Sequence, residues 1–479
     1  MIEHNTLFIG GGWVPPKGSG RITVTSPSTE EVIGSCPEAS RADIDRAATA
    51  AREAFDDPTG WSRWSPQERA DALERFALAL DARAEATACA VSSQNGMPIR
   101  TAQNVEAVTP PLLLRYYGGL AASQKEERRD AMFGGTTIVQ RVPIGVVAAI
   151  APWNFPQSLS FLKIAPALAA GCTLVVKPSP ETVLDSYVMA EAAAEAGIPG
   201  GVLNIVPAGR EGGAYLVTHP KIDKVAFTGS TAAGRTIAEN CGRLLRPVTL
   251  ELGGKSAAIV LDDADIAADI ESFFAATLHN NGQTCFLGTR ILAPLNRYRE
   301  IVDVVTSMAA KATVGDALDQ QTQVGPVVSA RQRDMIEGYI TRGIAEGATI
   351  TTGGGRPDDQ QRGYFISPTV FADVDNTHII AREEIFGPVL AVIPYSNDAD
   401  AIRIANDSNY GLGGSVWSAD PHRASEVARS IQTGSIGINS YMNDLASPFG
   451  GIKDSGIGRE MGPEGLASYQ VTKSIYAAP

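Results

Sequence analysis

The sequence predicts an α/β protein of two lobes, each built on a doubly wound parallel sheet. From residue 143 onward, short apolar runs alternate with amphipathic runs of helical spacing; the apolar runs include "VVAAIAP", "CTLVVKP", "VLNIVPA" and "KVAFTG". A second series, with "SAAIVLD" and "TRILAPL", follows residue 250. Buried parallel strands read as continuous apolar runs, and each needs a crossover helix, so this alternation favours parallel sheets with helices on both faces. At roughly 100–200 residues per domain, the 479 residues fit two to four domains.

The remaining segments flank these two series. Residues 1–35 read as short strands with turns, and residues 41–125 read as helices because apolar residues recur at spacings of three and four. Residues 126–142 are charged, then glycine-rich, then strand-like. The C-terminal run "SYQVTKSIYAAP" reads as a final strand. The seam between the two lobes is expected near residues 252–256.

The composition excludes several classes of partner. The net charge is −13 and the pI is about 5.0, so an acidic surface repels phosphate backbones and nucleic acid is not expected to bind. The five cysteines are scattered and form no CxxC pair, which favours reduced thiols in a cytoplasmic chain over a disulfide framework. The five histidines are scattered too, and no cluster predicts a metal site.

A membrane or secretory role is not expected either. The N-terminal stretch has no basic region followed by a long apolar one, so it does not resemble a signal peptide. The longest apolar stretch, residues 164–176, is interrupted by Pro166 and Gly171 and is too short to span a bilayer.

One glycine-rich segment, "KVAFTGSTAAG", could hold a phosphate. An apolar strand runs into Gly229 and Ser230 and then into a helix, so free backbone N–H groups, a hydroxyl and small residues meet at a helix start. Taken alone, an ordinary strand-to-helix turn with a serine cap is the better interpretation.

Two further segments each present one polar side chain in rigid or apolar surroundings. In "APWNFPQ", Pro152 and Pro156 restrict the backbone around Asn154, whose amide could stabilise an oxyanion or simply cap the next helix. In "TLELGGKS", Glu251 lies between apolar residues and a glycine pair, where a carboxyl tends to have a raised pKa and could act as a general base. A surface or ion-paired carboxylate is the alternative for Glu251.

The segment "HNNGQTCF" places Cys285 in a polar bend between two apolar elements. Backbone N–H groups in such a bend can stabilise a thiolate, the reactive form of cysteine. A buried structural thiol is the alternative, and the bend alone does not decide between them.

Seven short runs, in order along the chain, together resemble the aldehyde dehydrogenase superfamily. They are "PWNFP", "LVVKPSP", "FTGSTAAG", "ELGGKS", "NNGQTC", "EEIFGPV" and "SPFGGIKDSGIGRE". The interval between Glu251 and Cys285 also matches the interval between the general base and the nucleophile of that family. The resemblance implies a Rossmann-like NAD(P)-binding domain (1–122 and 143–252), a catalytic domain (253–453) and a small β oligomerisation arm (123–142 and 466–479). It also implies a homodimer or a homotetramer.

The resemblance implies a covalent mechanism that forms a carboxylic acid. Cys285 attacks the aldehyde to give a thiohemiacetal, Asn154 and the Cys285 N–H hold the oxyanion, and hydride passes to NAD. Glu251 then activates water to hydrolyse the thioester. Lys163 and Glu460 occupy positions proposed to relay protons to that base.

The resemblance also assigns cofactor residues. Lys177 is expected to bind the adenosine ribose, Ser230 the pyrophosphate with Trp153 nearby, and Glu384 the nicotinamide ribose, with Phe386 near the nicotinamide ring. Further cofactor contacts are expected from Ser179, Pro180, Gly229, Leu252 and Gly253.

One departure from the family concerns the choice between NAD and NADP. Many NAD-preferring members carry a glutamate at the position of Pro180, whereas here Glu181 is one residue later. Ser179 and Pro180 suit a helix cap and a first helical position. Since a carboxylate that would repel the 2′-phosphate is missing, NAD is expected to be preferred and NADP tolerated.

The residues matching the aldehyde tunnel are largely apolar and include no Arg or Lys cluster: Phe155, Leu159, Leu162, His279, Thr284, Phe286, Tyr441 and Asn443. This argues against dicarboxylic semialdehydes, which need a cationic partner, and fits a medium-chain, aromatic or terpenoid aldehyde. Leu162 stands where a bulky aromatic residue is common, which suggests room, and His279 is expected to pack rather than to bind a polar group.

Three rival functions stay open at this point. An acylating dehydrogenase would pass the thioester to coenzyme A, although such members commonly lack the glutamate found at 251. A non-catalytic structural relative would not need Cys285, Glu251 and Asn154 together. A thiol esterase could use the same cysteine and glutamate, but it would not explain the cofactor segments.

Overall fold

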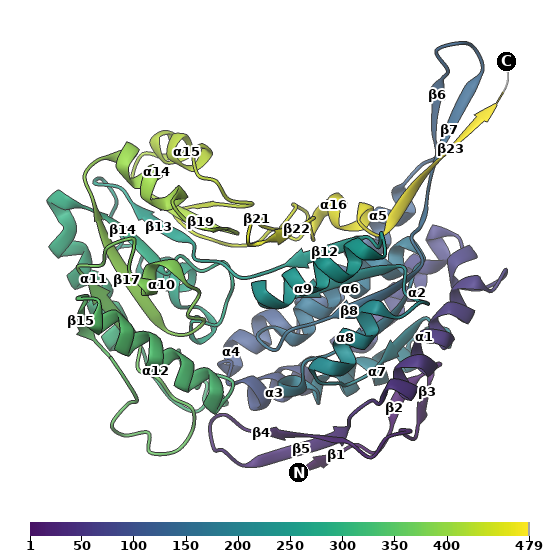
Figure 1. Ribbon diagram of the computed structural model, residues 1–479, viewed down its shortest axis with the longest axis horizontal. Coiled ribbons are helices and arrows are strands. Elements are labelled where there is room, and N and C mark those ends of the chain that lie inside the picture. The colour runs from purple at the N-terminus through teal and green to yellow at the C-terminus, as the bar shows by residue number, and fades with distance from the viewer. Residues whose placement is uncertain (478–479) are drawn as a thin grey trace.

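The computed structural model describes residues 1–477; residues 478–479, the end of the predicted C-terminal strand, lie outside the described residues. Figure 1 shows two α/β lobes side by side, with a narrow arm that projects from the first.

The first lobe is built on an eight-stranded sheet. Its order is β22 (Gly456–Ile457), β12 (Val248–Glu251), β11 (Lys224–Thr228), β8 (Val146–Ile150), β9 (Thr173–Lys177), β10 (Leu203–Ile205), β2 (Leu7–Ile9) and β3 (Gly12–Val14). The five strands from β12 to β10 are parallel, and the strand order reverses between β8 and β11. The flanking strands β22, β2 and β3 pair antiparallel, so the sheet is parallel in its centre and mixed at its edges. Ligands of open α/β sheets bind at such a reversal, beyond the carboxyl ends of the strands.

Helices cover both faces of this sheet, as the alternating pattern predicts. One face packs against α2 (Pro66–Asp81), α5 (Thr109–Ser123), α6 (Pro156–Ala170) and α7 (Asp185–Glu195). The other packs against α1 (Arg41–Asp56), α8 (Arg210–Thr218) and α9 (Thr231–Arg243). A separate three-stranded sheet of β1 (Ile2–Glu3), β5 (Val32–Pro37) and β4 (Arg21–Thr25) lies near the N-terminus, and α3 (Ala84–Asn95) and α4 (Ile99–Thr101) complete the lobe.

The second lobe is built on a seven-stranded sheet. Its order is β15 (Thr349–Thr352), β16 (Thr369–Ala372), β17 (Val389–Tyr395), β14 (Arg290–Pro294), β13 (Ala257–Val260), β19 (Gly414–Trp417) and β20 (Gly437–Ile438), and β15 is the one antiparallel edge strand among these seven. Helices α10 (Ile270–Leu278) and α11 (Tyr298–Lys311) pack on one face. The other face carries α12 (Ala330–Ala345), α13 (Ile379–Arg382), α14 (Asp398–Asn406) and α15 (Pro421–Arg429).

The chain passes from the first sheet to the second between β12, which ends at Glu251, and β13, which begins at Ala257. A short pair of β18 (Tyr410–Gly411) and β21 (Ile452–Lys453) precedes β22, which returns to the first sheet. We propose the division at 252/253 and at 453 as the domain boundaries, and the change of sheet at both places supports it.

The arm consists of β6 (Glu127–Asp130), β7 (Thr136–Pro143) and β23 (Gln470–Ala477), paired antiparallel in the order β23-β7-β6. The last strand starts at Gln470, within the predicted run that begins at Ser468, and α16 (Gly462–Ala467) precedes it. Leu466 is buried in the core of the first lobe, which keeps this helix with the body of the protein.

Two predicted helices are interrupted. The run "ETVLDSYVMAEAAAEAG" begins as a 3₁₀ turn, η3 (Pro180–Thr182), and α7 starts only at Asp185, because Val183 and Leu184 turn into a cluster with the N-terminal strands. Similarly, a π-helical segment, η2 (Ala102–Glu106), separates α4 from α5, whose first turn contains Pro110 and Pro111. Proline cannot donate the hydrogen bonds of a helix interior, so α5 must begin there rather than continue.

Within residues 1–477, no helix combines the length and the apolar character that crossing a bilayer requires. The same residues bring together no group of three or more His, Cys, Asp and Glu side chains that could hold a metal ion.

Candidate active site

Cys285 lies in the turn that joins α10 to β14, just after a 3₁₀ segment, η4 (Asn280–Gly282). Three residues in a row before it have positive φ angles: 49° at Asn280, 60° at Asn281 and 71° at Gly282. Asparagine and glycine tolerate this left-handed conformation best, which explains why these residue types occupy the turn. The polar residues before the cysteine therefore form a tight reversal that brings the thiol to the seam.

The side chains of the turn also anchor it to distant loops. The Asn281 amide nitrogen donates to the carbonyl oxygens of Gly96 at 2.8 Å and Pro326 at 3.0 Å, and its oxygen accepts from the Gly325 N–H at 2.6 Å. The Gln283 side chain accepts from the Val328 N–H at 3.0 Å. Because these groups are buried and satisfied, they fix the position of the turn rather than take part in chemistry.

Asn154 reaches the same turn from the end of β8. Its side-chain nitrogen donates to the Gln283 carbonyl oxygen at 3.0 Å, which leaves one N–H of the amide for another acceptor. Its own carbonyl oxygen accepts from the side chains of Asn95 at 3.2 Å and Asn280 at 3.0 Å. The Asn154 amide therefore contacts the turn that carries Cys285, at a residue two positions before the cysteine. This position is compatible with the oxyanion interpretation.

The Cys285 thiol is partly buried, and its pKa is raised above the ordinary value. Burial is the main cause, and the Glu384 and Glu251 carboxylates add to it, while the N–H groups of Cys285 and Phe286 act in the opposite direction. The expected backbone donors are therefore present, but burial outweighs them. The thiol is protonated at neutral pH and needs a base to become a nucleophile.

Glu251, at the end of β12, is a buried carboxyl group whose charge acts on this thiol. The side chain is buried, and neither carboxyl oxygen has a hydrogen-bond partner within residues 1–477. Burial and the nearby Glu460 raise its pKa well above the usual value, against the opposing charges of Lys163 and Arg459. A methyl group at Gly450 would come within 2.5 Å of Glu251 Oε1, so glycine there makes room for the carboxyl. Unpaired buried carboxyls of this kind are typical of acid–base residues.

Behind Glu251 lies a buried ion pair between Lys163 on α6 and Glu460. Their nitrogen and oxygen are 2.8 Å apart, and both side chains are at most 3% exposed. Lys163 also donates to the Thr228 hydroxyl at 2.6 Å, while one oxygen of Glu460 has no partner in the described chain. The charges of both residues act on Glu251, Glu460 raising its pKa and Lys163 lowering it.

The residues assigned to the adenosine end gather at the carboxyl ends of β9 and β11. Lys177 donates to the carbonyl oxygens of Ala208 at 2.8 Å and Pro178 at 2.9 Å, and burial lowers its pKa to about 8 although Glu181 and Glu38 oppose this. Ser230 caps α9 by accepting from the Ala233 N–H at 3.4 Å, and Gly229 precedes it. The cap confirms the local structure predicted for this turn, which also leaves a helix N-terminus suited to a phosphate.

Ser179 and Pro180 take the predicted first positions of a helical turn, but the serine does not cap it with its side chain. Its hydroxyl instead donates to the Glu181 carboxylate at 2.5 Å. The expected side-chain cap is therefore absent, because a nearby carboxylate is the stronger acceptor.

At the nicotinamide end, Glu384 accepts from the Gly254 N–H at 3.0 Å. Burial raises its pKa to about 7, against the Gly254 hydrogen bond and the Lys255 charge. Leu252 is buried against Gly234, and an added Cβ at Gly253 would collide with Glu384, so the backbone here is closely approached. The rings of Trp153 and Phe386 meet edge to face 5.2 Å apart. These residues offer a carboxylate for the hydroxyl groups of a ribose and aromatic surfaces for the planar nicotinamide ring.

The residues assigned to the aldehyde are mostly apolar, and two of them, Leu159 and Phe286, pack against the same hydrophobic cluster as Cys285. Phe286 stacks on Tyr441 at 4.5 Å and meets Phe449 edge-on at 6.3 Å. Phe155 stacks on His279 at 6.0 Å, and burial lowers the pKa of His279 to about 4, so its ring is neutral. Leu159 is partly buried beside Phe155, Leu162 is fully buried in the core, and the Thr284 hydroxyl donates to the His279 carbonyl oxygen at 3.3 Å.

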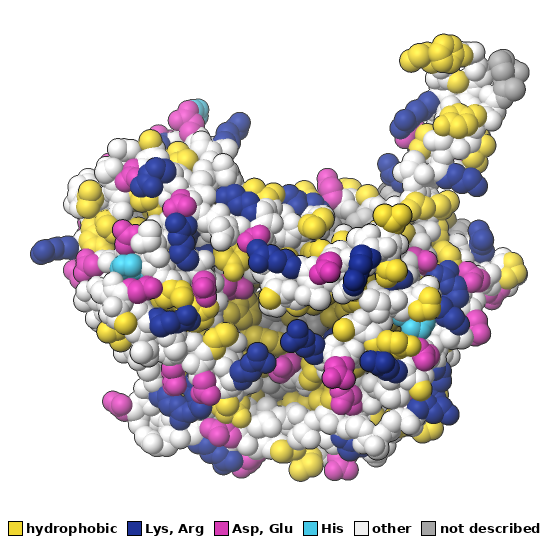
Figure 2. Space-filling view, viewed as in Figure 1, with side chains coloured by type: hydrophobic (Ala, Val, Ile, Leu, Met, Phe, Trp, Pro, Cys, Tyr) yellow, Lys and Arg dark blue, Asp and Glu magenta, His cyan; other side chains and the backbone are white. Residues whose placement is uncertain are grey.

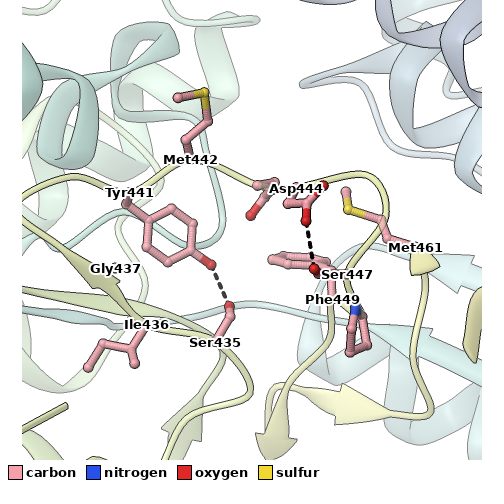
Figure 3. Close-up of a pocket in the computed structure, with 11 residues that line it drawn as sticks. Ser435, Ile436, Gly437, Tyr441, Met442, Asp444, Ser447, Phe449 and Met461 are labelled. Atoms are coloured by element: carbon pink, nitrogen blue, oxygen red, sulfur yellow. Dashed lines mark hydrogen bonds between the residues drawn. The ribbon is translucent and has the colours of Figure 1, made fainter. Parts of the chain in front are cut away.

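A cavity of about 160 Å³ is lined by Tyr441, Phe449 and residues of the loop between them. Figure 3 shows the Tyr441 hydroxyl pointing to Ser435, 2.5 Å away, with Met442 and Met461 around the space. Asn443 also lines this cavity.

The whole chain matches known proteins of one family. Residues 13–475 match the family model described as "Aldehyde dehydrogenase family". The chain is 56% identical over 476 residues to geranial dehydrogenase of Castellaniella defragrans, covering 99% of both chains. The solved structure of Mycobacterium tuberculosis aldehyde dehydrogenase complexed with NAD+ superposes with a TM-score of 0.97 at 47% identity, covering 99% of this chain and 98% of that one. A Pseudomonas syringae aldehyde dehydrogenase complexed with NAD+ and octanal superposes with a TM-score of 0.94 at 38% identity, covering 98% and 96%.

The chain belongs to the aldehyde dehydrogenase family.

As an NAD-dependent aldehyde dehydrogenase, the protein oxidises an aldehyde to a carboxylic acid. The comparisons confirm the predicted family, the two-lobed α/β fold and the use of NAD. NAD, when bound, accepts the hydride.

Sequence reasoning missed the residues that hold this site in shape. Asn95, Asn281 and Gln283 bridge segments that are distant in the chain, and Lys255 is a fully buried amine whose pKa burial and Arg290 lower to about 7, against the Glu384 carboxylate. The sequence offered one signal, the density of amides before Cys285, but not their partners.

Proposed function

We propose that this aldehyde dehydrogenase acts on hydrophobic aldehydes of the medium-chain, aromatic or terpenoid kind. The observation that carries the proposal is the apolar and aromatic character of the residues assigned to the aldehyde: Phe155, Leu159, Phe286 and Tyr441, with a neutral His279. An aldehyde with a carboxylate tail would lack a cationic partner there, and burying an unpaired charge is costly. The names of the relatives agree, since one is a geranial dehydrogenase and one structure holds octanal.

The test compares kcat/KM for citral, hexanal, benzaldehyde and succinic semialdehyde, with NADH absorbance as the readout. We expect the three neutral aldehydes to exceed succinic semialdehyde by about 100-fold or more, since an unpaired buried charge costs several kcal/mol. Equal or better turnover of the semialdehyde would contradict the proposed substrate class.

The proposed reaction begins with removal of the Cys285 proton by Glu251 and attack of the sulfur on the aldehyde carbon. A C–S bond forms, the C=O bond becomes an oxyanion, and the Asn154 amide and the Cys285 N–H stabilise it. As the C=O bond re-forms, hydride leaves the carbon for NAD⁺, and a thioester remains on Cys285. Glu251 then takes a proton from water, which attacks the thioester; the acid leaves and the thiol is restored. Lys163 and Glu460 are proposed to carry protons away from Glu251.

Transfer of the thioester to coenzyme A is less well supported than hydrolysis. Glu251 has two free carboxyl oxygens in the described chain and a raised pKa, which suits it to activate water. A non-catalytic role would leave the enclosed set of Cys285, Glu251 and Asn154 without a purpose. Hydrolysis of activated esters is compatible with the same cysteine and base, as a side activity.

For the cofactor, we propose that NAD is preferred, that NADP is tolerated, and that Glu181 supplies much of the preference. The Glu181 carboxylate accepts a hydrogen bond from the Ser179 hydroxyl. Of the nearby charges, it has the largest effect on the pKa of Lys177. At an effective dielectric of about 20, the Glu181 carboxylate and a 2′-phosphate charge ~6 Å away would repel each other by about 3 kcal/mol. Exposure of Glu181 to solvent weakens this repulsion.

Glu181→Gln is therefore expected to raise the ratio of kcat/KM for NADP to that for NAD by about tenfold, equivalent to about 1.4 kcal/mol. Glu191→Gln, an exposed carboxylate on the same helix region, should leave the ratio unchanged. An unaltered ratio in Glu181→Gln would show that another group discriminates between the two cofactors.

We further propose that the arm joins copies of this chain into a homodimer or a homotetramer. Its tip exposes Met132 and Phe133, which are 91% and 96% exposed, and Tyr476 is exposed on its last strand. Figure 2 shows hydrophobic side chains gathered on the projecting arm. Such a patch, far from the body of the protein, is typical of a surface that a partner covers.

Phe133→Asp is expected to reduce the oligomer to a smaller species, because it places a charge in the proposed contact. Light scattering coupled to size exclusion measures the change, with Leu295→Asp, an exposed leucine outside the arm, as the control. If Phe133→Asp keeps the wild-type mass, the tip is not at the interface.

A cytoplasmic location is proposed as well, since all five cysteines are free thiols.

A further inference from the structure

Glu106 is a completely buried carboxylate that the proposed chemistry does not use. It ends the π-helical segment η2, and its side chain is 0% exposed. One carboxyl oxygen accepts from the Gln157 N–H at 2.8 Å, and the other accepts from the Ser158 N–H at 3.2 Å. Both of its acceptor atoms therefore bind backbone groups of one other segment.

Those two N–H groups belong to the first turn of α6. The first N–H groups of a helix have no partners within the helix. Here the residue in the cap position is Phe155, whose side chain cannot accept a hydrogen bond from them. Pro156 has no N–H at all. Glu106 thus caps α6 from a distant part of the chain, and a negative charge at a helix N-terminus is electrostatically favourable as well.

The capped turn directly follows Asn154. Pro156 makes the backbone between them stiff, while the Asn154 carbonyl oxygen is held from the other side by Asn95 and Asn280. The direction of the Asn154 amide is therefore set by the start of α6 on one side and by these two asparagines on the other.

A second buried carboxylate, Asp185, completes the cluster but binds different atoms. It accepts from the side chains of Gln157 at 2.7 Å and Gln94 at 3.1 Å, and from no backbone N–H of α6. Burial raises the pKa of Glu106 and of Asp185 to about 7, and for Glu106 hydrogen bonds from Ser158 and Gln157 oppose the rise while Asp185 adds to it. The N–H groups of α6 favour the charged form of Glu106.

We propose that Glu106 is a positioning residue for the reaction: its carboxylate fixes the start of α6 and thereby aims the Asn154 amide at the oxyanion. This inference rests on the proposed role of Asn154. It predicts that the effect of Glu106 on catalysis passes through Asn154 and through no other group.

The experiment is a double-mutant cycle with Glu106→Gln and Asn154→Ala, measured as kcat for NADH formation and for hydrolysis of 4-nitrophenyl acetate. Glutamine can accept only one of the two N–H groups and brings an NH₂ against the other. Since loss of an oxyanion donor costs about 100- to 1,000-fold, a misaimed donor should cost about tenfold in both activities. In the Asn154→Ala background, Glu106→Gln should cost nothing further, and the KM for NAD should stay unchanged.

Asp185→Asn is the matched control, because it disturbs the same buried cluster without touching the cap. It should lower the Tm about as much as Glu106→Gln while kcat stays within about twofold of wild type, as expected when only stability changes. If Glu106→Gln does not fold, Glu106→Asp, which keeps the charge but withdraws it from α6, replaces it in the cycle.

Two results would overturn the inference: a folded Glu106 variant with wild-type kcat, or an equal loss with and without Asn154. These differ from failure of the proposed oxyanion role, in which Asn154→Ala alone would leave both activities unchanged.

Discussion

Replacing Glu251 by glutamine is expected to leave one slow round of NADH formation and to stop the second. The thioester forms without hydrolysis, so each active site can release one NADH before water is needed. Because general-base catalysis contributes about 100- to 10,000-fold, steady-state turnover should fall by that factor. Rapid mixing with NAD⁺ and hexanal measures a burst whose amplitude equals the concentration of active sites.

The pH dependence of that burst follows from the Cys285 thiol. Its pKa is raised by burial and by nearby carboxylates, so the thiolate fraction is small at neutral pH and increases as the pH rises. In Glu251→Gln the burst should therefore accelerate with pH, while the steady-state rate stays low. Glu384→Gln, which removes a different buried carboxylate near the thiol, should not produce a burst followed by arrest. A Glu251→Gln enzyme with wild-type turnover would show that another group activates water.

Replacing Cys285 by alanine is expected to abolish both NADH formation and ester hydrolysis. Without the sulfur no thiohemiacetal forms, and an aldehyde that is not tetrahedral has no hydride to release. Loss of a nucleophile typically lowers kcat by about a millionfold, to the background of the assay. NAD should still bind, as protein fluorescence can show, because Cys285 does not lie among the residues assigned to the adenosine end.

Cys89→Ala is the matched control, since Cys89 is an exposed free thiol. It should keep full activity and remain sensitive to thiol reagents, whereas Cys285→Ala should have no activity left to inhibit. Residual NADH formation above one-thousandth of wild type would point to a hydride transfer that needs no covalent intermediate.

The two parallel-sheet lobes were predictable because buried strands and amphipathic helices carry strong periodic signals. The proximity of Asn154 to Cys285 was predicted through the family resemblance, and the hydrogen bond from Asn154 to Gln283 agrees with it. The apolar character of the aldehyde site was inferred from the residues at positions that match the family's tunnel, and it stays a prediction.

Other features depend on contacts between residues far apart in the chain, which periodicity does not encode. Asn281 binds Gly96 and Pro326, and Glu106 binds the first turn of α6, so neither role is visible in the local sequence. The state of the Cys285 thiol was predicted only in part, because the backbone donors were expected but the opposing effects of desolvation and of the Glu384 and Glu251 carboxylates were not. The start of β23 at Gln470 likewise follows from Leu466 packing into the core.

The most direct test of the proposed mechanism is the mass of Glu251→Gln after incubation with NAD⁺ and hexanal. We expect a covalent adduct that makes the protein heavier by the mass of one aldehyde less two hydrogens. Peptide mapping should locate this adduct on Cys285. That mass is specific to a thioester, since a thiohemiacetal would retain both hydrogens. An unmodified protein that has nevertheless formed NADH, or an adduct on a residue other than Cys285, would contradict the central claim that this cysteine carries the substrate through oxidation.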